Sequence, residues 1–173
     1  MFTADGADGL CRSVITLANG LADRYEIELI SLYRRRKSLA YDLDPRVTVT
    51  NLHDARPVGP KGHRRGGRVR IKDHPDRDPR AAALDGQPSS LVGRAADPTM
   101  SRLTDTLLET KLEGLRPGVL VSTRPALHAA AAEYAPPEMI TIAQDHQNFV
   151  TRMPALRELI QTSSRRLDCL VTL

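Results

Sequence analysis

Polar side chains that could take part in chemistry follow a short apolar segment near the end of the sequence. Asp145, His146, Gln147 and Asn148 come directly after the apolar residues 139–143. An imidazole can orient an acceptor hydroxyl and assist proton transfer near neutral pH, which makes His146 a candidate catalytic group. The alternative interpretation is a loop histidine that caps the segment after it.

Asp145 is the second candidate catalytic group because it is adjacent to this histidine. Adjacent residues of an extended chain point to opposite sides, so Asp145 is not an obvious hydrogen-bond partner of the His146 ring. The two amides that follow, Gln147 and Asn148, are candidates for binding the substrate. We therefore expect these four residues to line a cleft at the end of a strand.

A second group of polar residues follows the apolar residues 119–121. Arg124 can bind an anionic acceptor or a departing diphosphate through two parallel N–H groups, and a purely structural role remains equally open. Thr123 is interpreted as the N-cap of a helix that begins at Pro125. His128, one turn further on, is expected to be a packed or surface residue of that helix.

The sequence begins with a glycine-bearing turn that opens a helix. Backbone N–H groups at a helix N-terminus can bind an anion or a sugar hydroxyl, so Gly6 and Gly9 are candidate binding residues. Their spacing is not the GxGxxG of dinucleotide sites, and Asp5 and Asp8 would repel a phosphate. A plain structural turn is the alternative. If the turn is functional, Arg12 is the expected phosphate partner.

Two basic stretches follow this turn. Residues 34–37 are Arg-Arg-Arg-Lys, and residues 53–97 are rich in proline, glycine and basic side chains. The second stretch has too few apolar residues to offset the entropy of ordering, so we expect a flexible basic insertion. Residues 34–37 are interpreted as a solvated loop or, together with the insertion, as a patch that attracts anionic lipid headgroups.

Short apolar segments that alternate with helical patterns position these side chains. Such segments are too short for helices and are typical of buried parallel strands joined by crossover helices. Helices are expected to start at residues 10, 98, 125 and 154, and strands are expected at residues 25–32, 47–52, 119–121, 139–143 and 169–173. The predicted fold class is α/β, a Rossmann-like open parallel sheet flanked by helices, with a ligand crevice at the carboxyl ends of the strands.

The composition limits the classes of function. A chain of 173 residues can form one domain, and with aromatic residues at only 3% its core must consist of Val, Ile, Leu and Ala. A net charge of +4, without basic residues interleaved with aromatic ones, does not indicate a nucleic-acid partner. Cys11 and Cys169 have neither disulfide nor metal-site spacing and are interpreted as small buried hydrophobic residues. The sequence shows no membrane span or signal peptide, so a cytoplasmic protein is expected.

The two ends of the sequence resemble cut strands. Only residues 1–4 could form a strand before the first helix, and the last predicted strand ends with the chain. We therefore expect residues 1–173 to be a single Rossmann-like domain that is incomplete at both ends, with residues 53–97 inserted into it.

Five segments occur in an order that resembles a known enzyme family. They are GADGLCRSVITLANGLA, ELISLYRRR, LDPRVTVTNL, RPGVLVSTRPALHAAAAEYAP and ITIAQDHQNF. In this order they resemble the N-terminal domain of family-4-like GT-B glycosyltransferases. The similarity covers most of the chain outside residues 53–97, and it implies one half of an enzyme built from two Rossmann-like halves.

The resemblance also implies a function and roles for the candidate residues. The N-terminal half of such an enzyme carries the acceptor and the C-terminal half holds the nucleotide-sugar donor, so we expect a hexosyltransferase that is inactive without its second half. By resemblance, Gly6, Gly9 and Arg12 approach the donor phosphates, and His146 lies beside the reacting sugar. The resemblance is to a metal-independent site, so no metal or other cofactor is expected.

The expected partners follow from the same resemblance. They are a nucleotide-sugar donor, a hydroxyl acceptor on a glycan, lipid or metabolite, the missing C-terminal domain, and an anionic membrane at its inner face as a peripheral contact. Nucleic acid is not among them. The alternative function is a non-catalytic Rossmann-like module that binds an anionic ligand or a partner through its basic loop.

Overall fold

The computed structural model describes residues 1–56 and 78–172. The chain divides into two compact units, residues Met1–Arg77 and Asp78–Leu173. Each unit combines parallel strands with helices, so the predicted α/β class with Rossmann-like sheets is confirmed. The strands of residues 1–56 and 78–172 pair in two parallel sheets, one in each unit.

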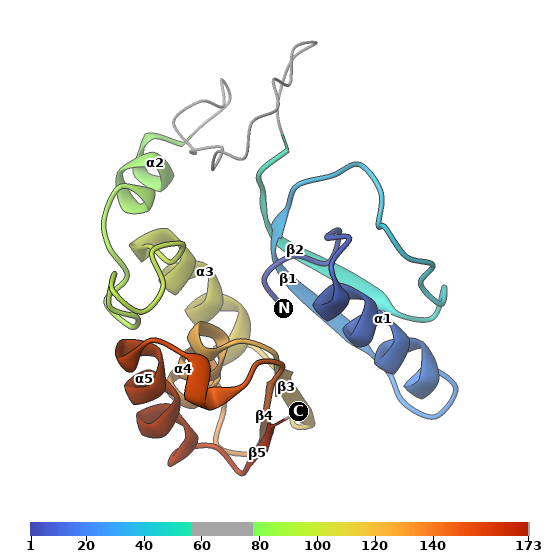
Figure 1. Ribbon diagram of the computed structural model, residues 1–173. Helices are drawn as coiled ribbons and strands as arrows, with labels where there is room; N and C mark the ends of the chain where they lie inside the picture. Colours follow the sequence, from blue (N-terminus) through green and yellow to red (C-terminus); the bar gives the residue numbers. More distant parts are fainter. Residues whose placement is uncertain (57–77, 173) are drawn as a thin grey trace. The chain divides into compact units, whose positions relative to one another are not determined.

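The first unit is a parallel strand pair with one helix packed on it. Strands β1 (Glu28–Arg34) and β2 (Thr48–Asp54) pair in parallel, and helix α1 (Gly9–Leu21) lies beside them (Figure 1). Residues 1–4 also lie along β1: Thr3 forms a parallel bridge with Tyr33. The sequence suggests at most a remnant of a strand at residues 1–4, and the structure has a single bridge there. The core of the unit is apolar and consists of Ile15, Ala18, Ala22, Leu29 and Val47.

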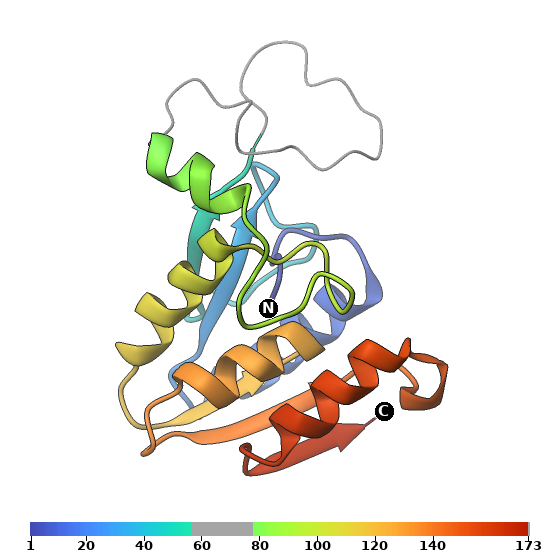
Figure 2. The ribbon, with the colours of Figure 1, turned by 90° about the vertical axis from the view of Figure 1, so that its left-hand side faces the viewer.

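The second unit is a three-stranded parallel sheet with helices on one face. Its elements are α2 (Pro79–Asp85), α3 (Arg102–Glu113), β3 (Val119–Ser122), α4 (Pro125–Tyr134), β4 (Ile140–Asp145), the 3-10 turn η2 (Phe149–Thr151), α5 (Pro154–Ser164) and β5 (Cys169–Thr172). The strand order is β3-β4-β5. Helix α4 packs on β3 and β4, and α5 packs against α4 (Figure 2). None of the helices in residues 1–56 and 78–172 is long and apolar enough to cross a membrane.

Helix α3 begins four residues later than the sequence suggests. Asp97 is not its N-cap; Ser101 is, because the Ser101 hydroxyl accepts from the Thr104 N–H and the Thr104 hydroxyl accepts from the Ser101 N–H. This reciprocal capping satisfies two backbone donors that the helix start would otherwise leave open. Asp97 instead accepts from the Thr99 N–H at 2.9 Å and pairs with Arg124.

The sequence predicts a flexible insertion at residues 53–97, and the described part of this segment differs from that expectation. Its residues 57–77 lie outside the described residues. The remainder includes the end of β2, helix α2 and a loop in which Val92 is fully buried. The carboxylate of Asp105 holds this loop, since it accepts from the Ser89 hydroxyl at 2.6 Å and from the Ser90 N–H at 2.7 Å. A buried carboxylate that receives several hydrogen bonds can order a segment that has few apolar side chains.

The two cysteines differ in their surroundings. Cys11 is buried, as expected, whereas Cys169 is exposed. Cys169 lies opposite Ile142 in the register of β4 and β5, and residues on that side of the sheet, including Ile140, are exposed. The interpretation of Cys169 as a buried hydrophobic residue is therefore wrong, because the helices of the second unit cover only the other face of its sheet.

Candidate functional site

The carboxyl ends of β3 and β4 bring two of the predicted polar groups to one edge of the second sheet. Strand β3 ends at Ser122 and strand β4 at Asp145. The strands are parallel neighbours, with Ser122 opposite Ala143, so the residues that follow both strands meet at the same edge. Thr123 and His146 are therefore the first residues of two adjacent corners.

The first corner is held by a hydrogen bond between a serine and a histidine. The Ser122 hydroxyl and Nδ1 of His128 lie 2.7 Å apart, and both side chains are buried. Helix α4 places this histidine, because its N-cap is Arg124 and its first turn lies directly over the strand end. The imidazole is thus fixed in orientation through Nδ1, which leaves Nε2 for another contact.

The second corner is held by a buried ion pair. The Asp145 carboxylate accepts from Nε of Arg152 at 3.1 Å and, through its other oxygen, from Nη2 of the same guanidinium. The side chains of Arg152 and Asp145 are only 8% and 2% exposed. The 3-10 turn η2 brings Arg152 back to the strand end, and Asn148 caps that turn by accepting from the Val150 N–H at 2.9 Å. Two parallel hydrogen bonds fix the carboxylate in one orientation.

The histidine of the first corner is neutral at physiological pH. The pKa of His128 is lowered to about 4, mainly by burial; the Asp145 carboxylate acts in the opposite direction, and Arg152 and His146 add to the lowering. These effects also show that the two corners interact electrostatically. A neutral imidazole can donate or accept one hydrogen bond at Nε2 without introducing a charge.

Three buried polar atoms at these corners have no hydrogen-bond partner in the described structure. They are Oγ1 of Thr123, Nε2 of His128 and Nε2 of His146. Buried polar atoms are nearly always hydrogen-bonded, and leaving one unpaired costs about 1–3 kcal/mol. We call the set Ser122, Thr123, His128, Asp145, His146 and Arg152 the β3–β4 corner. Each of its unpaired atoms can still form one hydrogen bond.

The other residues proposed for substrate binding make contacts within the second unit. Arg124 Nη2 donates to Asp97 at 3.0 Å, so its guanidinium ties the loop before α3 to the start of α4. Gln147 is exposed, and its backbone N–H donates to Asp145 at 3.3 Å. Thr123 is not the N-cap of α4, in contrast to the sequence interpretation, because Arg124 occupies that position.

The glycine turn lies in the first unit and is described separately from the β3–β4 corner. Asp8 caps α1 by accepting from the Cys11 N–H at 2.9 Å, so a carboxylate already occupies this helix N-terminus. A Cβ at Gly6 would lie 2.6 Å from Sγ of Cys11, whereas a Cβ at Gly9 would meet open space. Arg12 is exposed. Only Gly6 is required by close packing, and the proposed binding roles of all three remain predictions.

Sequence reasoning missed the two hydrogen-bonded pairs that hold the corner. The Ser122–His128 hydrogen bond spans six positions, from a strand end to the first turn of the next helix, and Arg152 pairs across seven. A usable signal was available at α4: its sequence PALHAAAAEY is apolar almost throughout, which predicts a buried helix and hence a buried histidine.

The comparisons with known proteins come from sequence. No protein-family model matches the chain. It is 30% identical over 171 residues to an exopolysaccharide phosphotransferase of Streptomyces coelicolor. The similarity covers 93% of this chain but only 17% of that protein. The chain is therefore similar to one segment of a transferase, and it spans about a sixth of that relative's length.

Proposed function

We propose that the chain is the acceptor-side domain of a sugar-transferring enzyme. In the reaction, a sugar passes from a nucleotide-diphosphate donor to a hydroxyl group of a glycan, lipid or metabolite. The observation that carries the proposal is the β3–β4 corner, where three buried polar atoms lack partners at the carboxyl edge of a parallel sheet. Open α/β sheets bind their ligands at this edge. The similarity to a transferase supports the same class of activity.

The residues of the corner take distinct roles in this proposal. Nε2 of His146 accepts the proton of the acceptor hydroxyl while the acceptor oxygen bonds to the sugar carbon and the bond from that carbon to the diphosphate breaks. His128 and Thr123 hydrogen-bond neighbouring hydroxyls of the acceptor. Asp145, held by Arg152, keeps a negative charge close to the two histidines. Stabilising the departing diphosphate is mainly electrostatic and falls to a donor-binding domain outside this chain.

A second candidate reaction is the transfer of a sugar phosphate. The name of the Streptomyces coelicolor relative, an exopolysaccharide phosphotransferase, favours it. The acceptor chemistry is the same in both reactions, because a hydroxyl must be oriented and deprotonated in each. The products differ: sugar transfer makes a glycosidic bond, whereas sugar-phosphate transfer makes a phosphodiester.

A chimera tests the proposal. This chain replaces the matching segment of the relative, and the product is analysed by mass spectrometry and ³¹P NMR for a glycosidic bond or a phosphodiester. Loss of a general base lowers kcat by about 10²–10⁴-fold, which is the effect expected for His146→Ala in an active chimera. The matched control is Gln161→Ala, which removes an exposed polar side chain of α5 outside the corner.

The outcomes separate the hypotheses. Equal rates for His146→Ala and Gln161→Ala remove His146 from the mechanism. A phosphodiester product replaces the first reaction by the second. If the chimera has no transferase activity and this chain still binds an anionic ligand, the result supports the alternative of a non-catalytic binding module.

A further inference from the structure

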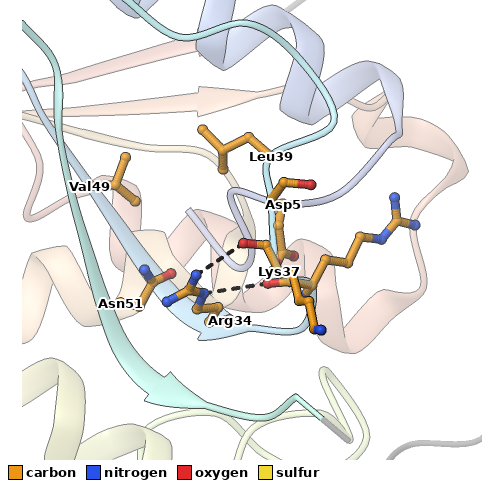
Figure 3. Close-up of a pocket in the computed structure, with 8 residues that line it drawn as sticks. Asp5, Arg34, Lys37, Leu39, Val49 and Asn51 are labelled. Atoms are coloured by element: carbon orange, nitrogen blue, oxygen red, sulfur yellow. Dashed lines mark hydrogen bonds between the residues drawn. The ribbon is translucent and has the colours of Figure 1, made fainter. Parts of the chain in front are cut away.

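The first unit contains a pocket between the carboxyl end of β1, with the loop after it, and the first half of β2. The pocket has a volume of about 180 Å³. It is lined by Asp5, Arg34, Arg36, Lys37, Ser38, Leu39, Val49 and Asn51, six of which are labelled in Figure 3. We call it the β1 pocket, because five of its residues are the last residue of β1 and those of the loop after it. The β3–β4 corner contributes nothing to it.

The side chains of the β1 pocket carry an excess of positive charge. Arg34, Arg36 and Lys37 contribute three cations, and Asp5 contributes one carboxylate. The Arg34 guanidinium donates to the carbonyl of Lys37 at 3.1 Å and to that of Arg36 at 3.4 Å (Figure 3). It thereby folds the loop over the strand end. Arg36 and Lys37 are exposed, and the structure records no ion pair between either of them and another described residue.

The single carboxylate of the pocket is already hydrogen-bonded to three donors. Asp5 is 5% exposed, and its Oδ2 accepts from the backbone N–H groups of Arg35 and Arg36, each at 2.6 Å. Its other oxygen accepts from the Thr3 hydroxyl. Asp5 is therefore a positioning residue: it fixes the backbone of the basic loop and so holds Arg36 and Lys37 beside the β1 pocket.

We propose that the β1 pocket binds the phosphate group of a small phosphorylated ligand. Pockets that enclose whole drug-sized ligands measure about 300–1,000 Å³, so this one suits a single compact group. Arginine and lysine bind phosphate through charge-assisted hydrogen bonds, and the Asn51 amide adds an uncharged donor. The proposal goes beyond the transfer reaction and does not depend on it.

A free phosphorylated compound and a lipid headgroup present the same phosphate to the pocket. The test therefore has two arms on the 173-residue chain. In the first, ¹⁵N NMR follows titration with inorganic phosphate and with glucose 1-phosphate at low salt, with glucose as the uncharged comparison. In the second, the chain is sedimented with vesicles of phosphatidylcholine that contain phosphatidic acid. We expect saturable shifts at residues 34–39 and 51 in the first arm.

Three variants separate the pocket from general surface charge. The double variant Arg36→Gln/Lys37→Gln is expected to weaken phosphate binding about tenfold or more, because it removes two charge-assisted contacts. Ser38→Phe fills the pocket without changing the net charge and is expected to abolish the saturable shifts. Arg24→Gln removes one positive charge from an exposed position outside the pocket and is expected to change the affinity less than about twofold.

Each outcome decides the proposal. Binding in either arm that Ser38→Phe removes supports it, and the arm that responds identifies a soluble or a lipid-borne phosphate. Equal weakening by Arg24→Gln and by the double variant overturns it, since the attraction would then belong to the whole surface. The absence of saturable binding in both arms also overturns it. A failed transfer assay with His146→Ala leaves the result unaffected, because His146 is not part of this pocket.

Discussion

The strand ends of the two units carry polar groups of opposite character. In the β1 pocket the cations of Arg36 and Lys37 are exposed, and the carboxylate of Asp5 accepts from two backbone N–H groups. In the β3–β4 corner the charges of Asp145 and Arg152 are buried and paired with each other, while one atom each of Thr123, His128 and His146 has no partner among the described residues. Among the described residues, the end of β1 therefore presents charged side chains without an ion-pair partner, whereas the ends of β3 and β4 present hydrogen-bonding atoms without a partner.

This difference predicts two kinds of recognition. Exposed charges act over about 8 Å at physiological ionic strength, and salt screens them. Buried neutral donors and acceptors act only at contact distance, and salt has little effect on them. Binding at the β1 pocket should therefore weaken as salt rises, whereas hydroxyl binding at the β3–β4 corner should not. The following substitutions are ordered from the largest expected effect to the smallest.

Breaking the buried ion pair of the corner should have the largest effect on stability. Arg152→Met leaves the Asp145 carboxylate buried without its partner, and removing one member of a buried pair costs about 3–5 kcal/mol. Urea unfolding followed by circular dichroism at 222 nm measures the loss. The matched control in the first unit is Arg46→Met, which breaks the exposed Arg46–Asp44 pair and should leave the midpoint nearly unchanged. Equal losses in both variants would show that the corner is open to water.

Protonation of the corner should destabilise the second unit in mild acid. The pKa of His128 is about 4 in the folded chain, against 6.5 for the free side chain. Between these values the unfolded state binds a proton that the folded state does not, so stability falls as the pH drops from about 6.5 to about 4. Outside this pH range the titration of His128 does not change the stability further. The full shift corresponds to about 3 kcal/mol.

A substitution isolates this effect from the carboxylates that titrate in the same range. In His128→Gln the side chain keeps a hydrogen-bonding group but cannot be protonated, so the slope of unfolding free energy against pH between 6.5 and 4 should be smaller than in the parent chain. The measurement is a series of urea midpoints at half-unit pH intervals. Identical slopes in the two proteins would mean that His128 is accessible to protons in the folded state.

The sequence predicts the strands and helices better than it predicts their contacts. Short apolar runs predicted the strands of the described residues, because burial of a parallel strand requires a run of apolar residues. The helical patterns between them predicted the starts of α1, α4 and α5. The sequence misplaced the start of α3, because an Asp-Pro pair and a Ser-x-x-Thr pair are both good N-terminal caps of a helix and only the fold decides between them. The ordering of residues 78–97 depends on Asp105, which no local pattern in that segment reveals.

The candidate site is partly visible in the sequence for the same reason. Asp145 and His146 could be identified because the first ends a strand and the second follows it, and position along the chain then gives position in the fold. Arg152 and the Ser122–His128 pair depend on how far a turn and a helix carry a side chain back toward the strand ends. Tertiary packing decides whether these side chains lie beside the strand ends, and the spacing along the sequence alone does not.

The smallest expected effect concerns the glycine turn at the edge of the first unit. In Gly6→Ala the new Cβ would lie 2.6 Å from Sγ of Cys11 and 2.9 Å from a carboxylate oxygen of Asp8, so the turn must shift. Overpacking of this kind costs about 1–3 kcal/mol. Gly9→Ala is the matched control: its Cβ meets open space at the first position of α1, and alanine is the better helix former by up to about 1 kcal/mol.

Cysteine labelling measures this effect locally. Burial and the neighbouring Asp8 raise the pKa of Cys11 to about 11, so its thiol stays protonated and protected at pH 8, whereas Cys169 is exposed. Iodoacetamide should therefore label Cys169 first in every variant, and should reach Cys11 faster in Gly6→Ala than in Gly9→Ala. If both substitutions leave Cys11 equally protected, the turn has room for a side chain. Gly6 is then not required by packing, and the binding role that the sequence suggests is the remaining explanation for it.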